Sequence, residues 1–234
     1  MDTEAYIGQM IEYYDRRVDP QTIESTDEYA RMYDQMLQDI PWYAAMAQRM
    51  QTLFAGRRVL ELAAGDGRWA RHLAPVVDHI LGVDMVPRLK SRWPQVVEAG
   101  RDLPPGRVEF AQLDAHCPHL APGTFDAALV VNWFQHMPIQ RHAEFIDGLR
   151  RKVEPGGIVF LAINHYGPAV YAGLFSKPGD PNRYGTRQAF DGKEHDIIDN
   201  VFSQADLREI FGPVARDLRF ELAEKFFWIE FEMA

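Results

Sequence analysis

The fold is decided by one stretch of the chain, which reads Val59-Leu60-Glu61-Leu62-Ala63-Ala64-Gly65-Asp66-Gly67-Arg68-Trp69-Ala70. A short apolar run leads into a turn with two glycines, and residues typical of a helix follow. Glycine tolerates positive φ and lets backbone approach a ligand closely, so Gly65 and Gly67 suit a loop that holds a small molecule. The stretch therefore predicts a strand, a tight ligand-binding loop and a helix.

Two kinds of ligand are compatible with this glycine spacing. The pattern Gly65-x-Gly67-x-x-Ala70 matches a dinucleotide fingerprint, and Asp84 follows at about the expected separation of ~20 residues. However, Glu61 and Asp66 would face a pyrophosphate group that needs backbone amides. The acids therefore favour a cationic ligand over a dinucleotide.

The composition limits the classes of partner. The chain has 234 residues, a formal net charge of -9 and a pI near 5.4. This length predicts one α/β domain with additions. Binding to nucleic acid needs clustered Lys and Arg, so the excess of acids favours a small-molecule substrate and no nucleic acid.

Cysteine usage and hydropathy exclude further classes. Cys117 is the one cysteine, which rules out an intrachain disulfide and a multi-cysteine metal site, and the dispersed histidines lead us to expect no metal. The N-terminus is acidic, and no apolar run approaches the ~18 residues that span a membrane. We expect a cytoplasmic protein with no membrane partner, either a monomer or a homodimer.

The rest of the chain alternates strand and helix patterns. Strands are expected at residues 79–84, 107–111, 125–131, 158–163, 217–223 and 225–232, which with the first strand give seven. The predicted fold class is α/β, with a doubly wound, mostly parallel seven-stranded sheet. We expect a helix over 86–99 that is interrupted at Pro94, and a helix capped by Ser203.

Polar residues follow the predicted strands at the edge where ligands bind in open α/β sheets. Asp84 ends the second strand, where its two oxygens can accept hydrogen bonds from the hydroxyls of a ribose, and Met85 is assigned to the same site. The fourth strand ends in Asn132-Trp133-Phe134-Gln135-His136, and the fifth ends in Asn164-His165-Tyr166. We expect these turns to face the cofactor and substrate.

The opening stretch resembles motif I of the class I S-adenosylmethionine-dependent methyltransferases of the small-molecule type, whose pattern is acid-x-Gly-x-Gly-x-Gly. Here it reads Glu61-x-Ala63-x-Gly65-x-Gly67, with Ala63 in place of the first glycine. The Pro155-Gly156-Gly157 turn is similar to one that precedes the family's fifth strand. The resemblance covers roughly residues 57–232 and implies a Rossmann-like methyltransferase fold with S-adenosylmethionine as cofactor and S-adenosylhomocysteine as product.

The resemblance also implies where the cofactor lies. In the family, an acid after the third strand accepts a hydrogen bond from adenine, and Asp114 and Ala115 match that position. Residues 1–55 are expected to form an N-terminal helical lid, and residues 56–234 to form the cofactor-binding domain. The expected cofactor-binding residues are Glu61, Ala63, Gly65, Gly67, Asp84, Met85, Asp114, Ala115, Asn132, Trp133, Tyr13, Tyr29 and Tyr33.

The pattern loosens at about residues 165–200, where glycines, prolines and scattered aromatic residues replace regular periodicity. A connection of this length without periodicity is typical of a functional loop. We expect a substrate loop there.

Three residues are candidates for catalysis. His136 has a side chain that titrates near neutral pH and is a candidate base, although a structural role fits it equally well. Asn164 and Tyr166 are alternatives for positioning or deprotonating the substrate.

The predicted function is methyl transfer to an oxygen or nitrogen of a metabolite, as in secondary metabolite biosynthesis. An alternative on the same fold is a cyclase that converts S-adenosylmethionine into azetidine-2-carboxylate and methylthioadenosine. A non-catalytic binder and a dinucleotide oxidoreductase are two further alternatives. Glu61, Asp84 and Asp114 disfavour the non-catalytic binder, and Glu61 and Asp66 disfavour the oxidoreductase.

Overall fold

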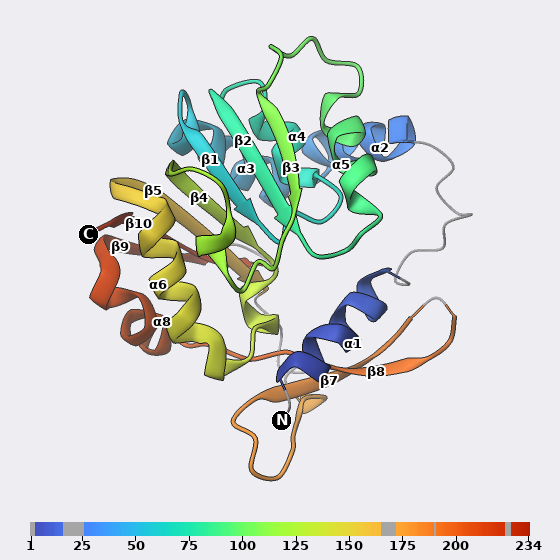
Figure 1. Cartoon of the computed structure of the whole chain (residues 1–234), viewed down its shortest axis with the longest axis vertical. Coiled ribbons are helices and arrows are strands. Elements are labelled where there is room, and N and C mark those ends of the chain that lie inside the picture. Colours follow the sequence, from blue (N-terminus) through green and yellow to red (C-terminus); the bar gives the residue numbers. More distant parts are fainter. Residues whose placement is uncertain (1–2, 16–25, 165–171, 190, 223–225) are drawn as a thin grey trace.

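The computed structural model describes residues 3–15, 26–164, 172–189, 191–222 and 226–234. Seven strands form one sheet in the order β3-β2-β1-β4-β5-β10-β9 (Figure 1). Their bounds are β1 Arg58–Leu62, β2 His79–Asp84, β3 Val108–Gln112, β4 Phe125–Val131, β5 Val153–Asn164, β9 Ala215–Leu222 and β10 Phe226–Met233. Strands β1 to β5 run parallel, and β10 is antiparallel to both β5 and β9. The predicted mostly parallel, seven-stranded α/β fold is confirmed.

Helices cover both faces of the sheet because its strands bury both faces. Within β1, Val59 packs in the cluster beneath α3 (Pro41–Phe54), α4 (Arg68–Leu73) and α5 (Leu89–Glu98). The next residue, Leu60, packs in the opposite cluster, beneath α6 (His142–Lys152) and α8 (Gln204–Phe211). The alternation of side chains along a strand sends neighbours to opposite faces, which gives the doubly wound arrangement.

The first two helices lie over different parts of the molecule. Helix α1 (Thr3–Asp15) lies beside β7 (Arg183–Gln188) and β8 (Glu194–Ile198) (Figure 1). Helix α2 (Thr26–Asp39) lies with α3 and α5 on the far side of the sheet. Tyr6 and Met10 of α1 pack against Tyr184 and Ile198, and Tyr29 and Tyr33 of α2 pack against α5. The division into a lid of residues 1–55 and a cofactor domain remains a prediction.

The expected interruption at Pro94 is wrong. Helix α5 runs from Leu89 to Glu98 with Pro94 inside it. Proline removes one helical hydrogen bond, here the bond to the carbonyl of Lys90. Trp93 and Val97 are fully buried beside it, and their packing holds the helix together.

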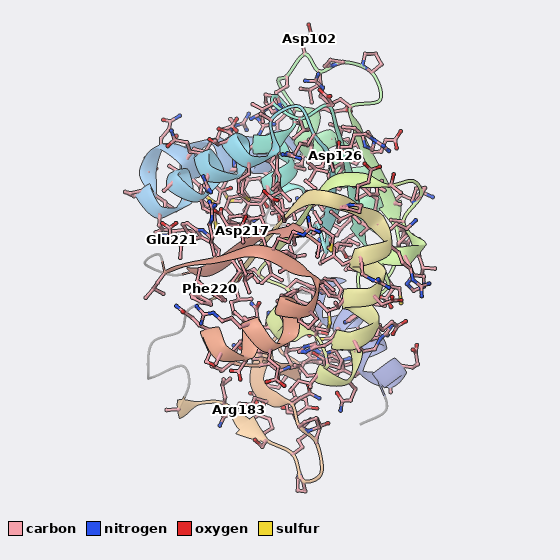
Figure 2. The ribbon with its side chains drawn as sticks, turned by 90° about the vertical axis from the view of Figure 1, so that its left-hand side faces the viewer. Asp102, Asp126, Arg183, Asp217, Phe220 and Glu221 are labelled. Carbon is pink, nitrogen blue, oxygen red and sulfur yellow. The ribbon has the colours of Figure 1, made fainter. Side chains whose placement is uncertain are left out.

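The expected loop at residues 165–200 is also wrong where the chain is described. A second sheet there has the strands β6 (Phe175–Ser176), β7 (Arg183–Gln188) and β8 (Glu194–Ile198), all antiparallel. It projects below the main sheet and carries Arg183 (Figure 2). These strands are short and rich in charged residues, so their sequence has no apolar alternation. Residues 165–171 and 190 lie outside the described part of the chain.

The predicted helix cap at Ser203 is confirmed. The Ser203 side chain and the Asp206 side chain cap α8 reciprocally. Short 3₁₀ turns join several elements, with η1 at Pro118–Leu120, η2 at Phe134–His136, η3 at Ile139–Arg141 and η4 at Gly212–Val214.

Among the described residues, no helix has the length and apolar character needed to cross a bilayer.

Candidate active site

A cavity of about 620 Å³ opens at the carboxyl ends of the central parallel strands. The strand order reverses between β1 and β4, and ligands of open α/β sheets bind at such a switch point. Thirteen of the sixteen predicted site residues line the cavity: Glu61, Ala63, Gly65, Asp84, Met85, Asp114, Ala115, Asn132, Trp133, Tyr13, Tyr29, Tyr33 and His136. The three others are Gly67, Asn164 and Tyr166.

The loop after β1 has positive φ at three alternate residues. The φ angles are 53° at Ala63, 55° at Gly65 and 85° at Gly67, the three glycine positions of the acid-x-Gly-x-Gly-x-Gly pattern. The motif thus encodes backbone conformation, and Ala63 adopts the left-handed region without being glycine. A Cβ atom at Gly67 would lie 2.7 Å from Cγ2 of Val97, so Gly67 allows close packing of α5 and does not line the cavity.

Asp84 fixes this loop from the end of β2. Its Oδ2 accepts a hydrogen bond from the Gly65 amide and its Oδ1 accepts one from the Val86 amide, each at 3.0 Å. Burial raises the pKa of Asp84, and these amide hydrogen bonds oppose the rise. Each carboxylate oxygen can accept more than one hydrogen bond, so Asp84 can hold the loop and a ligand hydroxyl together.

Glu61 presents an unpaired carboxylate oxygen. Its side chain is 2 % exposed, and its buried Oε2 has no hydrogen-bond partner among the described residues. Burial, with the nearby charge of Asp84, raises the pKa of Glu61 well above its usual range. A buried polar atom without a partner is costly, and a cationic N–H donor would satisfy it. The residues present therefore fit the ammonium-bearing cofactor that the fold implies.

Asp114 is held in place by its neighbours. Its Oδ1 accepts hydrogen bonds from the His116 amide at 2.8 Å and from His116 Nδ1 at 2.7 Å. Burial acts to raise the pKa of Asp114, but the hydrogen bonds from His116 outweigh it and the pKa is lowered. The His116 ring lies 4.7 Å from the ring of Trp133. These contacts build one wall of the cavity from the ends of β3 and β4.

Two tyrosines of α2 contact arginines of α4 and α5. The guanidinium of Arg92 lies 3.9 Å from the ring centre of Tyr29, and that of Arg68 lies 5.1 Å from the ring centre of Tyr33. One cation–π interaction of each ring is therefore already made within the protein. Both rings still line the cavity.

His136 is fixed in one tautomer. Its Nδ1 lies 2.6 Å from the Ile198 carbonyl oxygen, which can only accept, so we assign the proton to Nδ1 and the lone pair to Nε2. The Tyr6 hydroxyl donates to the His136 carbonyl at 3.3 Å and accepts from the Ile198 amide at 2.9 Å. Helix α1, η2 and β8 thus meet around this imidazole.

The two remaining catalytic candidates are not placed by the structure. Asn164 ends β5, but its side chain is outside the described part of the molecule, as is Tyr166. Five polar lining residues were missed by the sequence reasoning: Tyr14, Arg68, Arg88, His116 and Arg187. Arg68 and His116 directly adjoin the predicted motifs, so their place in the site could have been predicted from the sequence. Arg187 lies in the region without regular periodicity, where no sequence pattern indicates a site residue.

The chain has the Rossmann-like fold of methyltransferases, and part of it matches a protein-family model. A family model described as a methyltransferase domain matches residues 59–157 of the chain, from β1 to Gly157 within β5. This part of the chain, less than half of its length, is therefore similar to a methyltransferase domain.

Solved structures with the same fold extend the likeness over the whole chain. DhpI in its complex with S-adenosylhomocysteine is 22 % identical, with a TM-score of 0.69 over 99 % of this chain and 98 % of that one. The DhpI–SAM–HEP complex is 24 % identical, with a TM-score of 0.70 over 99 % and 100 %. The N-methyltransferase NodS from Bradyrhizobium japonicum WM9 is 13 % identical, with a TM-score of 0.56 over 83 % and 98 %. A comparison with curated proteins finds no significant match.

Proposed function

We propose that the protein transfers a methyl group from S-adenosylmethionine to an oxygen or nitrogen of a small molecule. The observation that carries this proposal is the buried, unpartnered Oε2 of Glu61 in the same cavity as Asp84 and Asp114. Carboxylates at these three strand ends suit a ligand with an ammonium group, a ribose and an adenine. The family domain and the likeness to a SAM-bound and an SAH-bound structure support the same cofactor.

Each part of the cofactor has a partner in the cavity. Glu61 would bind the ammonium group, Asp84 the ribose hydroxyls, and Asp114 the adenine amino group. When bound, S-adenosylmethionine supplies an electrophilic methyl group. The protein then has to align the nucleophile behind that carbon and exclude water.

His136 is proposed as the base that accepts a proton from the acceptor. Its Nδ1–H is held by the Ile198 carbonyl, so the lone pair is at Nε2, on a residue that lines the cavity. A hydroxyl or ammonium nucleophile loses a proton during methylation, and a positioned base contributes typically 10²–10⁴-fold to such a step.

The walls of the cavity favour a metabolite over a polymer. Helix α1 and strand β8 contribute Tyr13, Tyr14 and Ile197 to the lining, opposite the cofactor loops. A cavity of about 620 Å³ has the size of small-molecule sites, for which about 300–1,000 Å³ is typical. A role in secondary metabolite biosynthesis is consistent with this size.

The test is calorimetric titration with S-adenosylmethionine and S-adenosylhomocysteine, followed by incubation with S-adenosylmethionine alone and product analysis. We expect both to bind and S-adenosylmethionine to survive without an acceptor. Failure of both to bind would contradict the proposal. Formation of methylthioadenosine with azetidine-2-carboxylate would replace methyl transfer by the cyclase reaction.

A further inference from the structure

The two ends of the cavity differ in charge. Its four lining carboxylates come from the carboxyl ends of β1 and β2 and from the loops after β1 and β3, namely Glu61, Asp66, Asp84 and Asp114. The opposite end is lined by α1, η2, β7 and β8, and among the described residues the charged side chain there is Arg187. Arg88 approaches that end, since its Nη2 donates to the Tyr14 carbonyl of α1 at 2.9 Å. The cationic side chains at the end left for an acceptor are therefore Arg187 and, close by, Arg88.

The Arg187 side chain is positioned by an ion pair with a buried carboxylate. Its Nη2 lies 2.6 Å from Oδ2 of Asp199, whose side chain is 1 % exposed and does not line the cavity. Its guanidinium also lies over Gly185, where a Cβ atom would come within 2.9 Å of Nη1. The Asp199 carboxylate is thus buried, while the Arg187 side chain is 37 % exposed and lines the cavity.

The guanidinium has donors left for a ligand. A guanidinium carries five N–H groups in a planar fork. In the described part of the chain, one Nη1 donor reaches the Thr186 carbonyl at 3.3 Å and one Nη2 donor reaches Asp199. Three donors remain, and a fork of this kind matches the geometry of carboxylate and phosphate groups.

Two consecutive residues at the end of β8 position both the proposed base and Arg187. The carbonyl of Ile198, the last residue of β8, holds His136, and the next residue, Asp199, holds Arg187. An acceptor bound to Arg187 through one end can therefore present its nucleophile to His136 with the other. Neutral or cationic acceptors would leave the arginine unpaired on its cavity side.

We propose that the methyl acceptor is a small anion whose carboxylate, phosphate or phosphonate group binds Arg187, with Arg88 adding to the positive field. This inference rests on the proposed function and specifies its substrate class. Arg187 is a specificity-determining residue in this scheme, and Asp199 is its positioning residue.

The test uses full-length protein saturated with S-adenosylhomocysteine and titrated with inorganic phosphate, acetate and neutral acetamide. We expect at least one anion to bind in the millimolar range and acetamide not to bind. Arg187→Gln should weaken anion binding at least tenfold, and Arg187→Lys should weaken it less. The matched control is Arg183→Gln, because Arg183 is an exposed arginine on the same strand (Figure 2). It should leave anion binding unchanged.

The outcomes separate the two proposals. Affinity for S-adenosylhomocysteine should stay within twofold in all variants, which shows that they are folded. Absence of anion binding to the wild type, or equal binding to Arg187→Gln, overturns the inference. If the wild type does not bind S-adenosylhomocysteine, the proposed function fails, and the same titrations on the unliganded protein still decide whether Arg187 binds anions. The phosphate and acetate titrations distinguish the two anion classes.

Discussion

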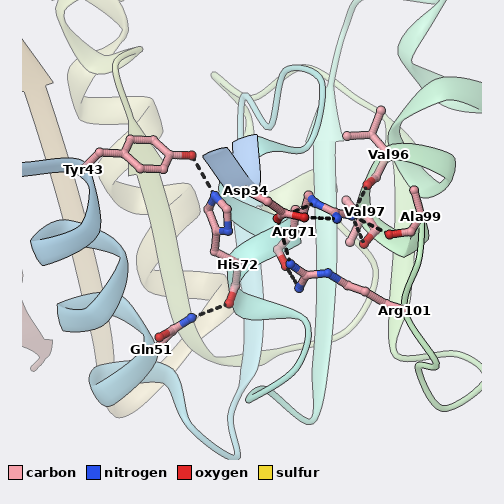
Figure 3. A network of polar contacts seen from close by, with 9 residues as sticks. All are labelled: Asp34, Tyr43, Gln51, Arg71, His72, Val96, Val97, Ala99 and Arg101. Atoms are coloured by element: carbon pink, nitrogen blue, oxygen red, sulfur yellow. Dashed lines mark hydrogen bonds and ion pairs between the residues drawn. The ribbon is translucent and has the colours of Figure 1, made fainter. Parts of the chain in front are cut away.

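Arg71 of α4 and Asp34 of α2 form a two-point ion pair, with Nε donating to Oδ1 at 2.9 Å and Nη2 to Oδ2 (Figure 3). The Arg71 side chain is nearly fully buried, and its Nη1 donates to the carbonyls of Val96 and Ala99. Arg101 adds a hydrogen bond to Asp34. The network joins α2 to α4 and α5 and so fixes the helix that carries the lining residue Tyr33.

Asp34→Ala should lower the free energy of unfolding and weaken cofactor binding. The substitution leaves Arg71 without its carboxylate partner, and because Asp34 is partly exposed we expect a loss of about 1–2 kcal/mol. The measurements are urea unfolding and the affinity for S-adenosylhomocysteine. Asp39→Ala, at the exposed end of the same helix, is the control and should change stability by less than about 0.5 kcal/mol. Equal effects of the two substitutions would refute the role of the ion pair.

Ala63→Gly should stabilise the protein. A non-glycine residue in the left-handed region destabilises the folded protein by roughly 1–2 kcal/mol. Glycine removes this strain, but its greater freedom in the unfolded chain offsets the gain by roughly 0.5–1 kcal/mol. With φ at 53°, we expect a net gain of about 0.5–1 kcal/mol in urea unfolding. The neighbouring Ala64 does not have positive φ, and Ala64→Gly should destabilise. A loss of stability in Ala63→Gly would show that the methyl group makes a contact that outweighs the strain.

Asp84→Ala should weaken binding of S-adenosylmethionine and S-adenosylhomocysteine by about 1–3 kcal/mol, or roughly 5- to 150-fold. The substitution removes the proposed ribose contact and also the acceptors of the Gly65 and Val86 amides. Calorimetry measures the affinities. Asp78→Ala, just before the amino end of the same strand, should have no effect. Unchanged affinity in Asp84→Ala would refute the assignment.

His136→Asn separates the proposed base from a structural role. The asparagine amide can replace Nδ1–H as the donor to the Ile198 carbonyl but offers no base at the Nε2 position. Once an acceptor is known, we expect kcat to fall by about 10²–10⁴-fold while the affinity for S-adenosylmethionine stays constant. A kcat within threefold of the wild type would leave His136 with only a structural role.

His142→Phe should make stability less dependent on pH. His142 is buried and stacks on Phe134 with ring centres 4.8 Å apart, and burial lowers its pKa from 6.5 to about 4. Below pH 6.5 the unfolded chain binds a proton that the folded protein does not, so this histidine makes stability fall as the pH drops toward 4. Phenylalanine keeps the stacking and removes the proton.

The wild type should therefore lose about 1–2 kcal/mol more than His142→Phe between pH 7 and pH 5. Urea unfolding at several pH values measures the difference. Other buried groups also make stability depend on pH. The pKa of His72 is likewise lowered to about 4, and the raised pKa values of Glu61 and Asp84 act in the opposite direction. These groups are present in both proteins, so their contributions cancel in the comparison. Parallel pH profiles for the two proteins would contradict the assignment.

Much of the fold followed from local patterns. The apolar runs before Glu61 and Asp84 predicted buried parallel strands, because such strands hide both faces and need no alternation. The cap at Ser203 was likewise predictable, because the residues that form it lie within four positions of the sequence. The small sheet of β6 to β8 and the continuous helix at Pro94 were not predictable in this way. Their stability comes from packing against α1 and against the main sheet.

For the site, the sequence by itself predicted the residues of the proposed cofactor end, whereas only the tertiary structure decided the proposed acceptor end. Glu61, Gly65 and Asp84 are set by strand ends and turn conformations, which are local properties of the chain. The Tyr6–Ile198 contact joins residues 192 apart, and the Asp199–Arg187 pair joins β7 to the residue after β8, in a sheet that no local pattern predicted. Contacts of this kind depend on which surfaces pack together, and that is a property of the whole folded chain.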